Sequence, residues 1–481
     1  MVQATDMGSG SITGADLAAL LPDLEAFHAR FGRFFCRSEG RRWGQRYVAG
    51  LLLPIARKNV ENIAERVGAP PRKLQQLISD SPWDDAGCVA ELQRLVGEQL
   101  GAADGVLVVD DTGFAKKGTC SAGVGRQSSG TLGRRDNCQV GVFVGYASRH
   151  GHTLVDRRLY LLEPWFDPGA APRRRRGGVP EGLGFATKPQ LAAELLGGIH
   201  AAGVLPFGWV TADAAYGDCH DLRQLIDQLG RWYVLEVSST AQVYDRDPAW
   251  QVPARRPGRG RPPSRPRPTP SSAAAVTVGD LVASFPPAAW VRHRATEGAK
   301  GPREYRFARV RVVEKRHRAP GPGGWLLARR PVGGGQVKYY LSNAPATVAL
   351  AELAWVGCPR WTVEEDFELA KGEVGLDHYE VTKLRGWYHH ITLVLLALAF
   401  VKFMQRKWEK PAGPRERPGG LCAAAGGAAT GGVEPGGGDR LVRGPAAAQG
   451  RRDRVASAAL AAGAPRRATL ANRRCSIRAR E

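Results

Sequence analysis

The sequence predicts an α/β protein, a central sheet covered by helices, and the clearest strand is GVLVV at 105–109. That run is apolar and β-branched and is followed directly by two aspartates, which is typical of a strand buried on both faces. Four further apolar runs, at 140–148, 153–163, 207–212 and 231–237, are also predicted strands. The last two alternate with helical segments, as strands of an α/β sheet do.

Three consecutive strands followed by alternating helix and strand form an RNase H-like layout. The first strand ends at Asp110 and Asp111, and the fourth ends at Asp213. Open sheets usually bind ligands at the carboxyl ends of their strands. Successive side chains point to opposite faces, so only one of the two adjacent aspartates can face a given site. A simple turn-forming role at a strand end is the alternative for this pair.

The 481 residues are enough for several structural units. The predicted units are an N-terminal helical, DNA-binding domain (1–100), the first part of the RNase H-like core (101–240), a basic linker with a β-rich insertion (241–348), C-terminal core helices (349–410) and a low-complexity basic tail (411–481). The tail is expected to be disordered, because it cannot bury enough apolar surface to offset its ordering entropy.

In the N-terminal unit, a Gly-Ala-Pro-Pro turn at 68–71 separates two short helical runs, the second of them basic. This spacing predicts either a helix-turn-helix or an ordinary helical hairpin.

The charge and the cysteine content indicate that the protein is intracellular and that its partner is nucleic acid. The formal net charge is +22, which favours a polyanionic ligand. The eight cysteines include no C-x-x-C pair, which argues against a zinc module and for reduced thiols in a cytosolic protein. The N-terminus resembles no signal peptide, and the longest apolar run, 391–401, is too short to span a bilayer. We therefore expect a cytoplasmic, nucleoid-associated protein with no membrane contact.

Three acids on separate elements are candidates for one metal site. Asp110 and Asp213 follow predicted strands, and Glu364 lies on a late predicted helix. Phosphoryl transfer by two metal ions requires carboxylates that converge from separate elements. Residues seven apart lie within about 20° on a helix, so Lys371 shares the face of Glu364 and Arg360 lies one turn earlier. A surface ladder of ion pairs is the alternative.

Three segments carry a specific resemblance: VVDDTGFAKKGTCSAGVGRQSSGTLGRRDNCQVGVF, VTADAAYGD and RWTVEEDFELAKGEVGLDHYEV. They resemble DDE transposases of bacterial insertion sequences, in particular the seven-oh-one family of the cut-and-paste group, over about residues 20 to 405. The D-x-T motif of that group selects Asp110, with Thr112, over Asp111. Its Tyr-Arg-Glu-Lys signature, Y-x₂-R-x₃-E-x₆-K, corresponds here to Arg360, Glu364 and Lys371.

The chain departs from this signature at the tyrosine position, which is Gly357. Glu365 is the alternative to Glu364 as the third acid.

The resemblance implies an RNase H-like fold and two Mg²⁺ or Mn²⁺ ions held by Asp110, Asp213 and Glu364. It also implies cleavage at insertion-sequence ends, strand transfer into target DNA, and a homodimer on double-stranded DNA that carries terminal inverted repeats. The expected DNA-binding residues are Arg360, Lys371, Lys116, Lys117 and Arg126.

Two other functions compete with transposition. The tail resembles a GC-rich gene translated in a shifted frame, so one alternative is a degenerate, inactive transposase that only binds DNA. The second is a non-specific RNase H-like nuclease.

Overall fold

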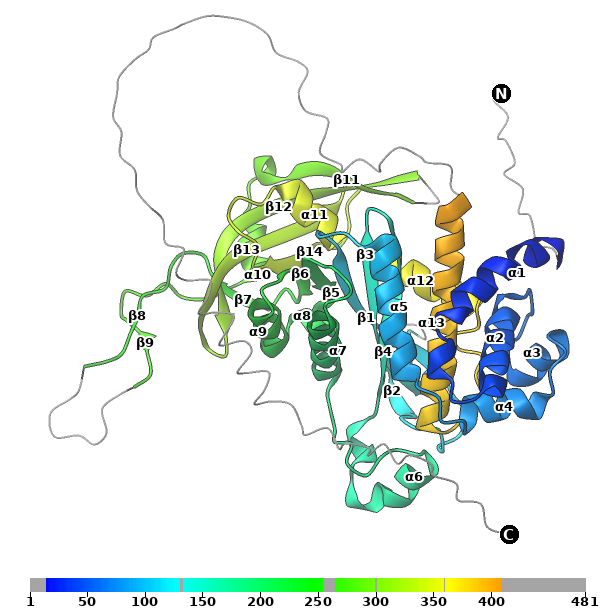
Figure 1. Ribbon diagram of the computed structural model, residues 1–481. Helices are drawn as coiled ribbons and strands as arrows, with labels where there is room; N and C mark the ends of the chain where they lie inside the picture. Colours follow the sequence, from blue (N-terminus) through cyan, green and yellow to red (C-terminus); the bar gives the residue numbers. More distant parts are fainter. Residues whose placement is uncertain (1–13, 130–132, 255–263, 299–300, 359, 409–481) are drawn as a thin grey trace, which may run out of the picture. The chain divides into compact units, whose positions relative to one another are not determined.

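The computed structural model describes residues 14–129, 133–254, 264–298, 301–358 and 360–408 (Figure 1). The predicted tail at 411–481 lies outside these residues. The described helices are α1 (Gly14–Ala29), α2 (Ser38–Leu52), α3 (Val60–Arg66), α4 (Pro71–Ser79), α5 (Asp85–Leu100), α6 (Ala171–Arg176), α7 (Lys188–Ala202), α8 (Ala214–Gly217), α9 (His220–Gln228), α10 (Val278–Ala283), α11 (Leu350–Gly357), α12 (Arg360–Gly372) and α13 (Leu384–Trp408). Short 3₁₀ turns lie at Gly32–Phe34, Glu163–Trp165, Pro168–Ala170 and Pro287–Ala289.

The described strands are β1 (Val106–Ala115), β2 (Gly125–Ser129), β3 (Arg134–Ser148), β4 (Gly151–Tyr160), β5 (Trp209–Ala212), β6 (Trp232–Val237), β7 (Gln242–Tyr244), β8 (Trp250–Gln251), β9 (Arg267–Pro268), β10 (Val276–Thr277), β11 (Val291–Gly298), β12 (Gly301–Arg316), β13 (Ala319–Pro331) and β14 (Lys338–Ser342). Twelve of them form one mixed sheet, and β8 pairs separately with β9. The predicted α/β class is therefore confirmed.

The strand order of the large sheet is β10-β7-β12-β13-β14-β6-β5-β1-β3-β2, with β4 also paired to β3 and β11 to β12. β1 is antiparallel to β3 but parallel to β5, and β5 is parallel to β6. The strands of the region 241–348 extend this sheet, since β14 pairs with β6. The predicted insertion is thus β-rich and continuous with the core.

Two predictions on local structure need correction. β1 does not end at its two aspartates, because antiparallel pairing with β3 continues from Val106 to Ala115. Only the parallel pairing with β5 stops there, at Val109 opposite Ala212. The Pro- and Gly-rich composition of the basic segment 164–184 predicts a loop, but the segment contains two 3₁₀ turns and α6.

Helices cover both faces of the sheet. Apolar residues 106–109 of β1 are fully buried, as the uninterrupted apolar run predicts. α12 packs closely on β3, because a Cβ at Gly145 would lie 2.5 Å from Val363 Cγ2. In Figure 1, α2 to α5 gather around α13, while α7, α8 and α9 lie beside β5 and β6.

The long helix α13 forms part of the interior. The helical segment Leu384–Lys407 is long and apolar enough to cross a bilayer, although its uninterrupted apolar run, 391–401, is too short to do so. However, 78% of its most apolar window is buried inside the protein. Two adjacent histidines lie on it: His389 Nδ1 donates a hydrogen bond to the Ile78 carbonyl, and His390 Nδ1 is hydrogen-bonded to the Tyr47 hydroxyl. The helix is therefore explained by packing.

Candidate active site

The register of three parallel strands brings three acids to one edge of the sheet. Val109 lies opposite Ala212, and Ala212 lies opposite Leu235. The next residue on each strand is acidic, in the order Asp110, Asp213 and Glu236. Asp110 is therefore a neighbour of Asp213, although more than a hundred residues of sequence separate the two.

Asp213 is held in place by the short helix that follows it. Its side chain caps α8 by accepting the Ala215 N–H at 3.0 Å. At the other end of α8, a Cβ on Gly217 would overlap the carbonyl oxygen of Glu236. Glycine at this position thus allows α8 to lie directly on β6, beside the acid edge.

The two adjacent aspartates of β1 face different partners. Asp111 accepts hydrogen bonds from Lys188 Nζ at 3.1 Å and from the Tyr216 hydroxyl at 3.0 Å. Asp110 instead lies 3.9 Å from the Arg360 guanidinium on α12. Thr112, two residues further, accepts a hydrogen bond from Lys371 Nζ at 2.7 Å, also on α12. Strand alternation therefore directs the D-x-T pair toward α12.

Arg360 connects the acids of three elements. Its Nη1 contacts Glu236 Oε2 at 3.0 Å, and its Nη2 contacts Asp110 at 3.9 Å and Glu364 Oε1 at 3.5 Å. Its side chain is 21% exposed. The arginine that was expected to bind DNA is thus in contact with the candidate metal ligands.

The two candidate glutamates of α12 point in different directions. Glu364 reaches Arg360 on the side of β1, and its side chain is 59% exposed. Glu365 lies near His152 and Lys402, at 3.8 and 3.7 Å. This geometry favours Glu364 over Glu365 for a site that includes Asp110.

Burial and mutual repulsion disfavour ionisation of the paired aspartates. The pKa of Asp110 is raised to about 7, mainly by burial and also by Asp213, while Arg360 opposes the rise. Burial likewise raises the pKa of Asp213, against the effect of Arg360. Such a pair is stabilised by a nearby cation.

The donor chemistry of this edge suits a hard divalent cation. Mg²⁺ needs only one or two carboxylates if water and substrate phosphate complete its octahedron. Asp110 and Asp213 meet this need, whereas Glu364 joins them only through Arg360. Over the described ranges, no three His, Cys, Asp or Glu side chains are close enough together to form a metal-binding group. Two of the three predicted ligands therefore converge, and the third is close by.

The predicted DNA-binding residues differ in their accessibility. Lys117 and Arg126 are exposed. Lys116 instead donates to the Tyr379 carbonyl at 2.8 Å and lies over that ring, and burial lowers its pKa to about 8. Lys371 is half-buried, and burial also lowers its pKa. Lys117 and Arg126 are thus the exposed members of the predicted DNA-binding set.

Glu236 is the residue of this site that the sequence reasoning missed. It lies inside the predicted strand 231–237 and not directly after a strand, as Asp110 and Asp213 do. Both of its carboxylate oxygens accept hydrogen bonds from Lys338 Nζ on the neighbouring strand β14, each at 3.0 Å. An acid in register with Asp213 on the next parallel strand was the available signal.

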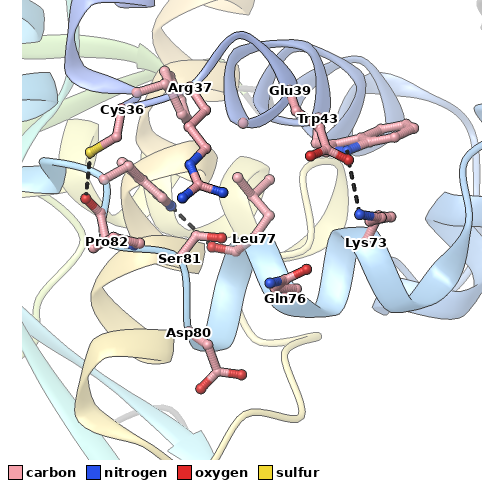
Figure 2. A pocket seen from close by; sticks show the side chains of 13 residues that line it. Cys36, Arg37, Glu39, Trp43, Lys73, Gln76, Leu77, Asp80, Ser81 and Pro82 are labelled. Atoms are coloured by element: carbon pink, nitrogen blue, oxygen red, sulfur yellow. Dashed lines mark hydrogen bonds and ion pairs between the residues drawn. The ribbon is translucent and has the colours of Figure 1, made fainter. Parts of the chain in front are cut away.

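A separate pocket of about 270 Å³ lies in the N-terminal helices, between α2 and α4 (Figure 2). An ion pair of Lys73 with Glu39, at 2.9 Å, lies at its wall beside Trp43.

The helices α3 and α4 match the two predicted short runs around the Pro turn. α4 buries Leu74, Leu77 and Ile78 and leaves its polar side exposed.

Comparison with known proteins identifies the family of this chain. The family described as DDE superfamily endonuclease matches residues 26–302, more than half of the chain. The matched region includes Asp110, Asp213 and Glu236, and Glu364 lies beyond it.

A relative described as a probable transposase for insertion sequence element IS701, from Microchaete diplosiphon, is 30% identical over 196 residues. The match covers 40% of this chain and about half, 48%, of that relative. The solved structure of a piggyBac transposase in a synaptic complex with hairpin DNA matches 83% of this chain and 77% of its own chain. Its TM-score of 0.34 and its sequence identity of 10% are too low to support a conclusion. The family match shows that the chain belongs to the DDE superfamily of endonucleases, and its similarity to the transposase relative agrees with the resemblance that the three motifs carry.

Proposed function

We propose that this protein is a DDE transposase that cuts DNA at the ends of an insertion sequence and joins those ends to target DNA. The observation that carries the proposal is the placement of Asp110 beside Asp213, with Arg360 linking Asp110 to Glu364. The similarity to a probable insertion-sequence transposase supports the same activity.

The topology supports an RNase H-like core for this activity. Within the large sheet, the consecutive strands β4-β3-β1-β5-β6 combine an antiparallel meander with two parallel strands. The acids lie where the parallel strands end, which is the edge where open sheets keep their ligand sites. The same strands thus form the scaffold and position the acids.

Asp110, Asp213 and Glu364 would hold two Mg²⁺ or Mn²⁺ ions. When bound, such ions activate the attacking water or hydroxyl and stabilise the leaving oxygen. The side chain of Glu364 on α12 is exposed, so it has room to turn toward the two aspartates at the sheet edge. Lys371, fixed on Thr112 beside Asp110, would bind the phosphate next to the scissile bond.

The basic surface would hold the DNA duplex. Phosphate contacts from Lys and Arg supply most of the affinity for DNA and depend on salt. Lys117 and Arg126 are exposed close to the first acid along the chain. The N-terminal helices are the proposed end-recognition unit, because α4 presents Arg72, Gln75 and Gln76 to solvent. Arginine and glutamine can read base edges in the major groove. We propose that two copies act together on the paired ends.

A paired assay tests this function. Purified full-length protein is incubated with DNA that carries the inverted repeats flanking its gene, and end binding and Mg²⁺-dependent nicking are measured side by side. Asp213→Asn is expected to abolish nicking while end binding persists. Binding without nicking by the native protein would instead indicate an inactive transposase that only binds DNA. Nicking of any DNA sequence would indicate a non-specific nuclease.

A further inference from the structure

A single guanidinium lies among four carboxylates at the sheet edge. Arg360 contacts Glu236, Glu364 and Asp110 directly, and Asp213 lies close enough to interact with it electrostatically. No other lysine or arginine of the described residues lies within 4.0 Å of Asp110. Much of the local positive charge is thus supplied by this one side chain.

The two terminal nitrogens of the Arg360 guanidinium form contacts of different length. Its Nη1 forms the shortest contact, 3.0 Å to Glu236, and Glu236 is only 15% exposed. Its Nη2 faces Asp110 and Glu364 at the longer distances of 3.9 and 3.5 Å. Its Nε is buried and has no hydrogen-bond partner among the described residues. The end near Asp110 is therefore the less firmly held part of the group.

Glu236 is itself held by a second cation from the insertion. Lys338 on β14 contacts both carboxylate oxygens at 3.0 Å. Glu236 thus accepts Lys338 through both oxygens and Arg360 Nη1 through Oε2, so a second cation holds the carboxylate that anchors Arg360. The longer Nη2 contact to Asp110 can be released while the Nη1 contact to Glu236 is kept. Since a unit charge close to a buried pair interacts strongly with it, the position of Nη2 matters to anything that binds Asp110.

We propose that Arg360 is an internal counter-cation of the acid edge, anchored by Glu236, and that it competes with a divalent cation for Asp110. The inference rests on the proposed function in one respect, that Asp110 and Asp213 are the metal ligands. Arg360 must turn Nη2 away from Asp110 for both aspartates to hold a metal ion. Nη2 then becomes available for a phosphate oxygen of DNA, which couples metal binding to DNA binding.

The test measures metal affinity directly. Mn²⁺ binding to the EDTA-treated, dialysed full-length protein is followed by electron paramagnetic resonance of the free ion, without DNA. Arg360→Gln should tighten Mn²⁺ binding about tenfold, because it removes the competing charge. Lys338→Gln is the matched control: it removes a cation from the same Glu236 but leaves Arg360 beside Asp110, so affinity should stay near the native value.

A second readout is the rise in melting temperature on adding Mn²⁺, which should be larger in Arg360→Gln than in the native protein. Arg360→Lys keeps the charge but is too short to contact Glu236 and Asp110 together, so its Mn²⁺ affinity should lie between the two. If Arg360→Gln does not fold, this variant decides the question, and native-like affinity would overturn the proposal.

Unchanged or weaker Mn²⁺ binding by folded Arg360→Gln, or an equal gain in Lys338→Gln, also overturns it. Asp213→Asn separates this failure from failure of the proposed function. If Asp213→Asn binds Mn²⁺ as the native protein does, the assigned metal site is wrong. If Asp213→Asn loses binding but Arg360→Gln gains none, only the counter-cation role is wrong.

Discussion

Asp110 and Asp213 are neighbours because β1 and β5 pair in parallel with Val109 opposite Ala212, and an aspartate follows each of these residues. Both side chains accept backbone N–H groups, from Asp111 at 2.8 Å and from Ala215 at 3.0 Å. Their orientation is thus set by the backbone before any ligand binds.

The first prediction compares the two adjacent glutamates of α12. Glu364→Gln should lower the nicking rate by more than about 100-fold, the upper range for changes in the outer shell of metal sites. Glu365→Gln should leave the rate within a few-fold, because its carboxylate faces His152 and Lys402 instead. Single-turnover nicking under saturating Mg²⁺ measures both. Equal losses would contradict the assignment of Glu364.

The second prediction concerns Lys371, whose Nζ lies 2.7 Å from Thr112 Oγ1 and 3.3 Å from the Gly113 carbonyl. Lys371→Ala should reduce DNA affinity about equally for all sequences and lower the salt slope by about one unit. Affinity measured at several salt concentrations gives that slope. Lys117→Ala, at an exposed position, is the control for an ordinary phosphate contact. An unchanged slope in Lys371→Ala would mean that this lysine serves only to hold Thr112.

The third prediction concerns a buried ion cluster on the opposite side of α12. Asp366 is fully buried, and its Oδ1 contacts Lys402 Nζ and His152 Nδ1, both at 3.0 Å. Asp366→Asn should lower the free energy of unfolding by about 3 kcal/mol, the lower end for a broken buried ion pair, because it removes the closer carboxylate of Lys402 and leaves only Glu365 at 3.7 Å. Urea unfolding measures the loss. Asp366→Asn combined with Lys402→Met should recover part of it, and no recovery would show that the amide itself is not accommodated.

The fourth prediction concerns the pH dependence of stability through His390. Its Nδ1 lies 3.0 Å from the Tyr47 hydroxyl, its Nε2 lies 3.1 Å from the Gly375 carbonyl, and burial lowers its pKa to about 3. The unfolded chain binds a proton at this histidine below its ordinary pKa of 6.5, whereas the folded chain does so only below about 3. Stability from this group is therefore complete above pH 6.5 and falls as the pH is lowered toward 3.

Melting temperatures of the native protein and of His390→Gln, compared from pH 7 to pH 5, test this. The decrease should be smaller in the variant. His389, whose pKa burial lowers to about 4, contributes a decrease of the same sign to both proteins. Parallel curves for the two proteins would show that His390 does not carry the effect.

The sequence alone was sufficient to predict the buried strands, the acids that follow them, and the helix face shared by Arg360, Glu364 and Lys371. Uninterrupted apolar runs predict buried strands because both of their faces must be covered, and those strands form at 106–109, 140–148, 209–212 and 232–237. The spacing of Arg360, Glu364 and Lys371 predicts one helix face, and all three do face β1 or its edge. Local patterns were sufficient here because a strand or helix fixes side-chain direction over a few residues.

Only the tertiary structure decided the contacts between distant residues. No local pattern assigns a role to Glu236, because that role depends on the parallel register with β5 and on Lys338 from a strand about a hundred residues later. Lys116 was predicted as a basic residue for DNA, but it packs on Tyr379, which lies between α12 and α13. The length of β1 past Asp110 likewise depends on β3, since a strand continues for as long as a neighbour satisfies its backbone. Register and packing join segments that are remote in the chain, and local sequence patterns contain no information on either.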